Sequence, residues 1–187
     1  MNRLHRWICR SGLWRKFLQD EMLPWALKDV DLGQNVLEIG PGPGLTTDLL
    51  RSRFDRITAL EVDPDLAVSL KRRMSDTNVT VTQGDASAMP FEDATFSGAV
   101  AFTMLHHVPS SALQDRLLHD VYRVLKPGGM FVGTDSVWSP VLWLIHISDT
   151  LVPVDTRTFK DRLEGAGFTD VQIELARKRF RFSARRA

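Results

Sequence analysis

Cysteine is almost absent from this sequence, since Cys9 is the only one among 187 residues. A single cysteine excludes an internal disulfide framework and is typical of proteins in a reducing compartment. Long apolar runs are missing too, because no segment reaches the roughly 18–20 consecutive apolar residues that a transmembrane helix needs. The N-terminus also lacks the apolar core of a secretory signal peptide. We therefore expect a cytoplasmic protein.

Net charge is small, at +1, and so points neither toward nor away from nucleic acid as a partner. Its distribution is uneven, because residues 1–19 and 175–187 carry basic side chains and no acidic ones. Apolar residues make up 43% of the chain, which is enough for the hydrophobic core of one domain. We find no internal repeat, low-complexity tract or linker, so we expect a single domain.

Short strand-like runs alternate with amphipathic helical ones along the chain. Strands are predicted at 35–39, 56–62, 78–85, 97–105 and 130–136, and helices at 45–54, 64–74, 110–129 and 155–167. This alternation predicts a parallel sheet with right-handed crossovers. Two further strands, at 168–175 and 177–184, predict an antiparallel hairpin at one edge. The expected fold is a doubly wound α/β domain.

A glycine-rich turn follows the first predicted strand, in the segment "NVLEIGPGPGLTTDLL". Glycine has no Cβ, so it permits positive φ and the close approach of a ligand to the backbone. In a doubly wound sheet, ligands bind at the carboxyl ends of the strands, where this turn is expected. The dinucleotide fingerprint G-x-G-x-x-G fits poorly, because Leu45 stands at its third glycine and Glu38 would repel a pyrophosphate.

Acidic residues are predicted at the ends of three consecutive strands: Glu38, Glu61 and Asp85. Glu61 follows Gly40 by 21 residues, and a carboxylate there can accept hydrogen bonds from both hydroxyls of a ribose. Asp85 can accept one from an adenine amino group. The three acids predict a ligand with an ammonium group, a ribose and an adenine, and with little negative charge. S-adenosylmethionine meets that description.

Five ordered motifs, "VLEIGPGPG", "ALEVDPD", "GDASAMPFEDATF", "LHHV" and "VLKPGGMF", resemble those of class I S-adenosylmethionine-dependent methyltransferases over roughly residues 34–135. The resemblance implies a seven-stranded Rossmann-like fold with S-adenosylmethionine as cofactor and S-adenosylhomocysteine as product. It also implies a set of cofactor contacts at the strand ends: Glu38, Gly40, Pro41, Gly42, Gly44, Glu61, Val62, Asp85, Ala86 and Phe102.

Each part of the cofactor has its expected partners in this set. By the resemblance, Glu38 and the glycine turn hold the methionine end, with Phe102 nearby. Glu61 takes the ribose hydroxyls and Val62 lies against the adenine. The adenine amino group is placed by Asp85 and Ala86. One departure from the family pattern is Ser97, where many relatives have Asp.

The resemblance also divides the single domain of residues 1–187. We expect an N-terminal helical cap at 1–33, a cofactor-binding core at 34–135, and an acceptor-lid segment with the last helix and edge hairpin at 136–187. The methyl acceptor is expected to be a small molecule, and a lipophilic one, because residues 137–147 ("VWSPVLWLIHI") are almost wholly apolar. The sequence does not name it.

Methyl transfer needs a general base only when the acceptor is a weak acid such as an alcohol or phenol. The candidates are His106 and His107, after the fourth strand, and Asp135, at the end of the fifth. His146, in the apolar segment, is predicted to face the acceptor. Metal-dependent transfer would need clustered carboxylates after the fourth strand, so we predict no metal ligand.

Three alternatives remain. The first half also resembles ribosomal RNA adenine dimethylases, but "FTMLHHVP" replaces the Asn-Leu-Pro-Tyr motif with which they grip a flipped adenine, so a nucleic-acid partner is not favoured. The Tyr122-x-x-x-Lys126 spacing of short-chain dehydrogenases is expected at the sheet edge opposite the crevice. A non-catalytic module that only binds S-adenosylmethionine fits the same motifs.

The two basic ends of the chain raise a further expectation. Trp7 and Trp14 share one face of a predicted N-terminal helix with arginines beside it, the pattern of a helix resting in a membrane interface. We therefore predict transient contact with anionic membranes. The competing interpretation packs both tryptophans into the lid.

Overall fold

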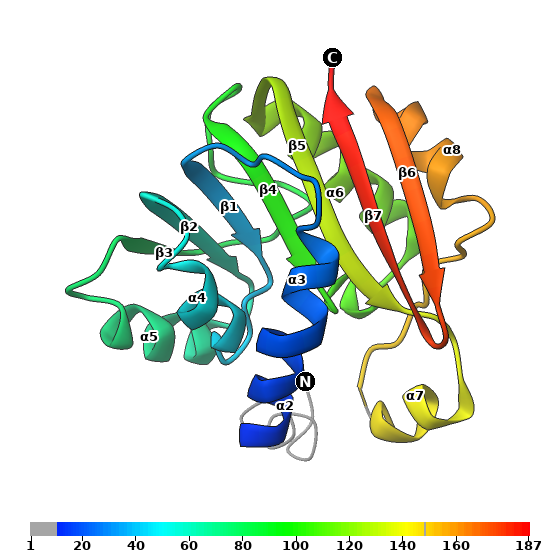
Figure 1. Cartoon of the computed structure of the whole chain (residues 1–187), viewed down its shortest axis with the longest axis horizontal. Helices are drawn as coiled ribbons and strands as arrows, with labels where there is room; N and C mark the ends of the chain where they lie inside the picture. The colour runs from blue at the N-terminus through cyan, green and yellow to red at the C-terminus, as the bar shows by residue number, and fades with distance from the viewer. Residues whose placement is uncertain (1–10, 148) are drawn as a thin grey trace.

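The structure is a computed structural model that describes residues 11–147 and 149–187. Its centre is a seven-stranded sheet in the order β3-β2-β1-β4-β5-β7-β6 (Figure 1). The first five strands in this order run parallel, whereas β7 is antiparallel to both β5 and β6. The strands are β1 Asn35–Ile39, β2 Arg56–Glu61, β3 Val79–Gln83, β4 Phe96–Phe102, β5 Leu125–Ser136, β6 Phe168–Ala176 and β7 Arg179–Arg186. The predicted doubly wound sheet and its antiparallel edge hairpin are confirmed.

Helices cover both faces of this sheet. They are α2 Gly12–Phe17, the π-helical turn η1 Leu18–Met22, α3 Leu23–Ala26, α4 Leu45–Leu50, α5 Pro64–Arg73, the short 3-10 helix η2 Leu105–His107, α6 Ser111–Val124, α7 Pro140–Ile145 and α8 Phe159–Gly165. The segments α2, η1 and α3 follow one another without a break. In Figure 1, α3 lies in front of the sheet and α6 behind it, whereas α2 lies below the central strands. None of the helices in the described ranges is long and apolar enough to span a bilayer.

Side chains on the two faces of the central strands pack into two separate hydrophobic cores. Val36 packs with buried residues of η1, α3, α4 and α5, whereas Leu37 and Ile39 pack with α6 and α8. The same alternation recurs in β5, where Phe131 and Val132 belong to opposite cores. Both faces of the central strands are therefore buried, as expected of a parallel sheet with helices on each side.

Several predicted boundaries are wrong, and the structure gives the physical reason for two of them. The helix predicted at 155–167 begins only at Phe159, because Asp155 first forms a turn in which it accepts hydrogen bonds from the backbone N–H groups of Arg157, at 3.0 Å, and Thr158, at 3.2 Å. The helix predicted to be stopped by the Pro-Gly-Gly segment at 127–129 ends already at Val124, and β5 begins at Leu125 rather than at Met130. Leu125 pairs with Phe96 of β4 before the ladder shifts register, so the Pro-Gly-Gly segment lies within an irregular strand start.

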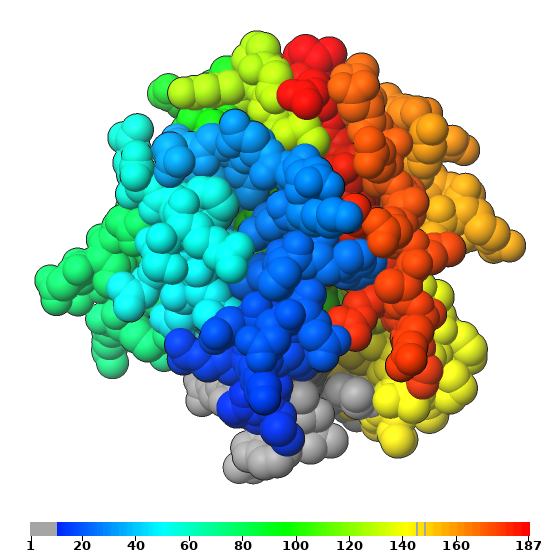
Figure 2. Space-filling view, in the orientation of Figure 1, coloured from blue at the N-terminus to red at the C-terminus, as the bar shows by residue number. Residues whose placement is uncertain are grey.

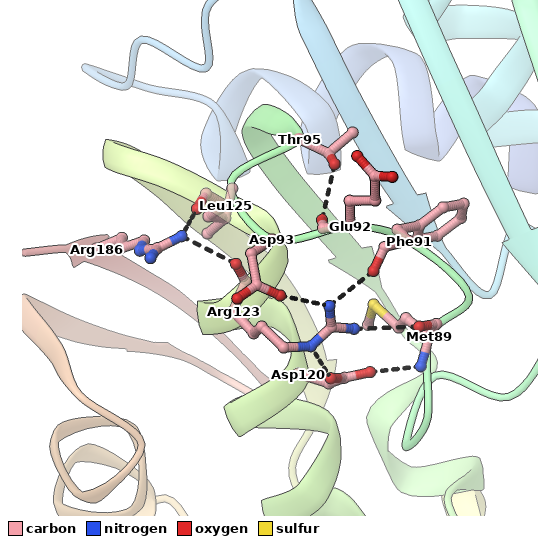
Figure 3. Close-up of polar contacts among 9 residues, drawn as sticks. All are labelled: Met89, Phe91, Glu92, Asp93, Thr95, Asp120, Arg123, Leu125 and Arg186. Atoms are coloured by element: carbon pink, nitrogen blue, oxygen red, sulfur yellow. Dashed lines mark hydrogen bonds and ion pairs between the residues drawn. The ribbon is translucent and has the colours of Figure 1, made fainter.

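Arg123, near the end of α6, anchors the loop that precedes β4 (Figure 3). Its guanidinium donates hydrogen bonds of 2.7–3.1 Å to the side chains of Asp93 and Asp120 and to the carbonyls of Met89 and Phe91. Arg186, at the end of β7, donates to the backbone carbonyls of Arg123 and Leu125. These contacts hold the amino ends of β4 and β5 in place, and so they help to position the carboxyl ends of the same strands.

Candidate cofactor and acceptor site

A cavity of about 340 Å³ lies at the carboxyl ends of β1, β2 and β4. Its size falls within the range of about 300–1,000 Å³ that is usual for small-molecule sites. The glycine turn after β1 and the residues that end β2 and β4 line it, together with η2, α7 and the N-terminal helical segment. The cavity therefore occupies the crevice that the doubly wound topology predicts for a ligand.

The glycine turn needs its glycines for two different reasons. Gly40, Gly42 and Gly44 all have positive φ, at 65°, 55° and 80°, a conformation that other residues adopt only with strain. A Cβ on Gly40 would come within 3.0 Å of Met104, so the turn is also packed from behind. A Cβ on Gly42 would meet no atom within 4 Å, and Gly42 lines the cavity. A side chain there would occupy the space that is left for a ligand.

Glu61, the last residue of β2, joins this turn to the second strand. Its Oε2 accepts a 2.8 Å hydrogen bond from the backbone N–H of Gly42, and its Oε1 accepts a 3.0 Å bond from that of Asp63. Burial raises the pKa of Glu61, and the two backbone hydrogen bonds oppose this. A carboxylate has about four lone-pair sites, so each oxygen keeps one for a hydroxyl in the cavity.

Glu38 lies beneath the turn and does not line the cavity, and it is only 1% exposed. Thr46, in the first turn of α4, donates a short hydrogen bond to its Oε1. Its Oε2 has no hydrogen-bond partner among the described residues. Burial raises the pKa of Glu38 to about 7. A buried carboxylate oxygen without a hydrogen-bond partner is costly.

Of the other predicted cofactor contacts, two line the cavity and two do not. Val62 lines the cavity and is 63% exposed, which leaves an apolar surface next to the Glu61 carboxylate. Phe102, buried at the end of β4, lines the cavity as well. Asp85 and Ala86 do not line it, and Asp85 instead accepts a 2.8 Å hydrogen bond from the backbone N–H of Ser87. Their proposed contact with adenine stays a prediction.

His106 and Asp135, two of the predicted catalytic residues, form a buried pair. Asp135 is fully buried, and its carboxylate accepts hydrogen bonds from both Nδ1 and the backbone N–H of His106, the latter at 3.1 Å. It also accepts a 2.6 Å hydrogen bond from the backbone N–H of Ser136. Burial lowers the pKa of His106, but the Asp135 carboxylate outweighs it, so the net shift is upward. Asp135 does not line the cavity and acts on it through His106.

His107 and His146 meet His106 at the same end of the cavity. His146 follows α7, and its Nε2 lies 3.2 Å from Nε2 of His106. The Nδ1 of His146 donates a 2.7 Å hydrogen bond to the carbonyl of Leu142. Burial, aided by His106, lowers the pKa of His146. All three histidines line the cavity, as do the apolar side chains of Leu142 and Met104. His146 thus lines the cavity, and its predicted contact with the acceptor stays a prediction.

A family model described as "Methyltransferase domain" matches residues 37–133, more than half of the chain. The chain belongs to this methyltransferase domain family. A solved structure from Pyrococcus horikoshii, the PH0226 protein, superposes on 96% of this methyltransferase domain with a TM-score of 0.81, at 17% identity, and 94% of that chain is covered. That likeness concerns the fold alone.

Named relatives include a hydroquinone methyltransferase, a sterol methyltransferase-like protein and a ribosomal RNA methyltransferase. The methyltransferase domain is 27% identical over 175 residues, 89% of its length, to 2-methyl-6-phytyl-1,4-hydroquinone methyltransferase 1 of Oryza sativa, and 34% identical over 71% of its length to sterol methyltransferase-like 3 of Botryococcus braunii. A probable ribosomal RNA small subunit methyltransferase A of Haloarcula marismortui is 38% identical over 48% of the chain. The chain spans 50%, 35% and 31% of the length of these relatives, respectively.

Two features of the methyltransferase domain lie away from the cavity. Ser97, the departure from the family pattern, donates a 2.8 Å hydrogen bond to the carbonyl of Leu32 and accepts a 3.0 Å bond from the N–H of Asn35. It therefore ties the amino ends of β4 and β1 together. Tyr122 packs edge-on against Phe168 and does not line the cavity, so its spacing with Lys126 is unrelated to this site.

Sequence reasoning missed several residues that line the cavity. Thr46 carries no signal beyond its place two residues after the glycine turn, and Thr103 has a strained φ of 51° that no sequence pattern indicates. Trp14 also lines the cavity and packs against Phe17 with ring centroids 5.0 Å apart, which favours the competing interpretation for this residue. Trp7 lies outside the described residues.

Proposed function

We propose that this chain binds S-adenosylmethionine in the cavity and transfers its methyl group to a small, lipophilic acceptor. The observation that carries the proposal is the convergence of the open glycine turn, the paired carboxylate of Glu61 and the exposed face of Val62 in one crevice. Hydroquinone and sterol relatives support an apolar acceptor, and so do the apolar side chains at the histidine end of the cavity. The bound cofactor supplies a methyl group that its sulfonium already makes electrophilic.

The residues of the chain then have four tasks. Glu61 accepts the ribose hydroxyls, and Val62 covers one face of the adenine. Glu38 lies beneath the glycine turn and binds Thr46, so it positions the turn that holds the methionine end. Phe102 and Met104 exclude water beside the reacting carbon. Holding the acceptor in line with the carbon–sulfur bond can lower the barrier by about 7–11 kcal/mol without any further chemistry.

Two other functions are less well supported. The likeness to a ribosomal RNA methyltransferase covers only 48% of the chain, and the segment "FTMLHHVP" after β4 contains neither the Asn nor the Tyr with which those enzymes grip a flipped adenine. A module that only binds the cofactor would leave the apolar, histidine-lined end of the cavity without a role.

Methyl-labelled S-adenosylmethionine tests the proposal directly. We expect S-adenosylhomocysteine and a labelled product with at least one acceptor from a panel of a prenylated hydroquinone, a sterol and a long-chain fatty acid. Adenine-containing RNA should stay unlabelled. Binding of the cofactor without turnover on any acceptor would favour the binding module, and labelling of the RNA alone would reinstate the RNA methyltransferase.

We also propose that the chain collects this acceptor from anionic membranes through an apolar surface around α7. This surface, here called the α7 patch, consists of exposed side chains: Trp138, Val141, Trp143, Leu144 and Ile147. The N–H of Val137 donates a 2.9 Å hydrogen bond to the carbonyl of Lys178, which brings the exposed basic turn Arg177-Lys178 beside the patch. Figure 2 displays the α7 segment in yellow at the lower right, next to the end of the β6–β7 hairpin. Apolar and basic side chains on one surface suit a bilayer with anionic headgroups.

Vesicle sedimentation checks the α7 patch. The parent should sediment with anionic vesicles at low salt, less with neutral vesicles, and less as salt screens the charges. Trp143→Ser should reduce the bound fraction by roughly five- to tenfold because a large apolar side chain leaves the interface. Val141→Ser and Val68→Ser form a matched pair, since the two valines are 54% and 51% exposed but only Val141 belongs to the patch. Equal binding by these two variants would contradict the proposal.

A further inference from the structure

Three histidines from two distant segments meet at the acceptor end of the cavity. His106 and His107 come from η2 and His146 follows α7, about 40 residues later in the chain. Each offers one ring nitrogen to the group, and these three nitrogens all lie within 4.8 Å of one another. The group lies at one end of the same cavity as Gly42 and Glu61. We name it the three-histidine cluster.

Hydrogen bonds behind the cluster determine which ring nitrogens face its centre. Nδ1 of His106 donates to Asp135, and Nδ1 of His146 donates to the carbonyl of Leu142 at 2.7 Å. A proton held on Nδ1 in this way leaves the lone pair of each neutral ring on Nε2. The two Nε2 atoms lie 3.2 Å apart, so two lone pairs face each other unless a proton or a cation lies between them.

The separation of these two nitrogens matches a shared metal ion. Imidazole nitrogens bind zinc at about 2.0–2.1 Å, and two of them on a tetrahedral ion are therefore roughly 3.3–3.4 Å apart. The observed 3.2 Å is close to that value. The ring of His107 is next to both, with centroids 4.3 Å from that of His106 and 5.0 Å from that of His146.

The surroundings of the cluster are those of a metal site rather than of three isolated histidines. Ligand histidines usually donate their second N–H to a carboxylate or a backbone carbonyl, which orients the ring and makes the nitrogen a better ligand. Asp135 and the Leu142 carbonyl perform these two tasks here. The Asp135 carboxylate behind His106 also offsets part of the charge of a divalent cation.

We propose that His106, His107 and His146 bind one divalent transition-metal ion, of which zinc is the type, at the acceptor end of the cavity. Three protein ligands leave a fourth position open, as in catalytic zinc sites. Resting on the proposed function, we assign that position to the hydroxyl oxygen of the acceptor, whose pKa the ion lowers. The hydroxyl proton leaves to solvent. The oxygen then forms the bond to carbon while the carbon–sulfur pair of electrons goes to sulfur, and the ion keeps its charge.

The proposed ligands are imidazoles, whereas the sequence analysis considered only a cluster of carboxylates after the fourth strand as a metal site. Imidazole is a better ligand than carboxylate for zinc-type ions, and one of the three rings comes from the apolar segment. Asp135 is a positioning residue in this account, because it acts on the ion only through His106.

Calorimetry with Zn²⁺ on tag-free protein, first stripped with a chelator, tests the proposal. We expect one ion per chain with a dissociation constant of about 1 µM or lower, and visible absorption typical of tetrahedral geometry when Co²⁺ replaces zinc. His106→Gln and His146→Gln should each weaken Zn²⁺ binding by more than about 100-fold, and Asp135→Asn by about 10- to 100-fold. His119→Gln is the matched control, since His119 is an exposed residue of α6 outside the cluster.

Binding of S-adenosylmethionine to the same stripped protein separates this inference from the proposed function. Parent protein that binds the cofactor but neither Zn²⁺ nor Co²⁺ would overturn the metal site alone, and it would assign the 3.2 Å contact to a proton shared by two histidines. Equal Zn²⁺ affinity in the parent and in the His106→Gln and His146→Gln variants would overturn it too. Protein that binds metal but never the cofactor would overturn the proposed function and leave the metal site standing.

Discussion

Replacing Glu61 with Gln is expected to weaken the binding of S-adenosylmethionine by roughly 10- to 150-fold. The estimate follows from the loss of about 1.5–3 kcal/mol when a hydrogen bond to a charged group is removed. Glu61 ends β2 with both carboxylate oxygens already held by the N–H groups of Gly42 and Asp63, so it cannot turn away from the cavity. Because S-adenosylhomocysteine has the same ribose, its affinity should fall by the same factor.

Asp65→Asn controls for the change in charge. Asp65 lies four residues after Glu61, is exposed and does not line the cavity, so this variant loses the same charge without losing a contact. Titration calorimetry on folded protein measures both variants against both ligands. Unchanged affinity in Glu61→Gln, or an equal fall in Asp65→Asn, would remove Glu61 from the ribose site.

A second large effect concerns stability, since Glu38→Gln should make the cofactor-free protein more stable at pH 8 than the parent. The pKa of Glu38 is raised from 4.5 to about 7 by burial. Its folded-state pKa is above the unfolded value, so its stabilising contribution is complete below about pH 4.5 and is lost as pH rises to about 7. At 1.36 kcal/mol per pKa unit, the loss approaches about 3 kcal/mol at pH 8. Glutamine cannot ionise, so the Glu38→Gln variant should not lose this stability as pH rises.

Urea unfolding of the parent and Glu38→Gln at pH 5 and pH 8 measures this effect. The difference in free energy of unfolding should be small at pH 5 and approach about 3 kcal/mol at pH 8. Glu92→Gln, at an exposed position, should differ little from the parent at either pH. A Glu38→Gln difference that does not change with pH would contradict the raised pKa.

The sequence predicted those parts of the site that local pattern determines. The glycine turn needs positive φ within a few residues of a strand end, and G-x-G-x-G directly after an apolar strand expresses this requirement. The position of Glu61 follows from strand order, because parallel strands bring their carboxyl ends to one edge. The glycine turn and Glu61 lie within about 20 residues of each other, so their spacing can be recognised in the sequence.

The remaining features depend on packing between distant segments. His146 reaches His106 only because the chain after β5 folds back over the cavity, and no spacing rule connects positions 106 and 146. The raised pKa of Glu38 depends on the Thr46 contact and on complete burial, neither of which appears in a motif. Trp14 was predicted to share a membrane-facing surface, but the N-terminal helical segment lies across the sheet and directs it into the cavity. The apolar surface is found at α7 instead.

The central claim is that one cavity, formed by the glycine turn and Glu61, binds S-adenosylmethionine. Titration calorimetry of the parent with S-adenosylmethionine, repeated with NAD as competitor, tests it most directly. We predict one site per chain, lower affinity in Glu61→Gln but not in Asp65→Asn, and no competition from NAD. Absence of cofactor binding by the folded parent, or its displacement by NAD, would contradict the claim.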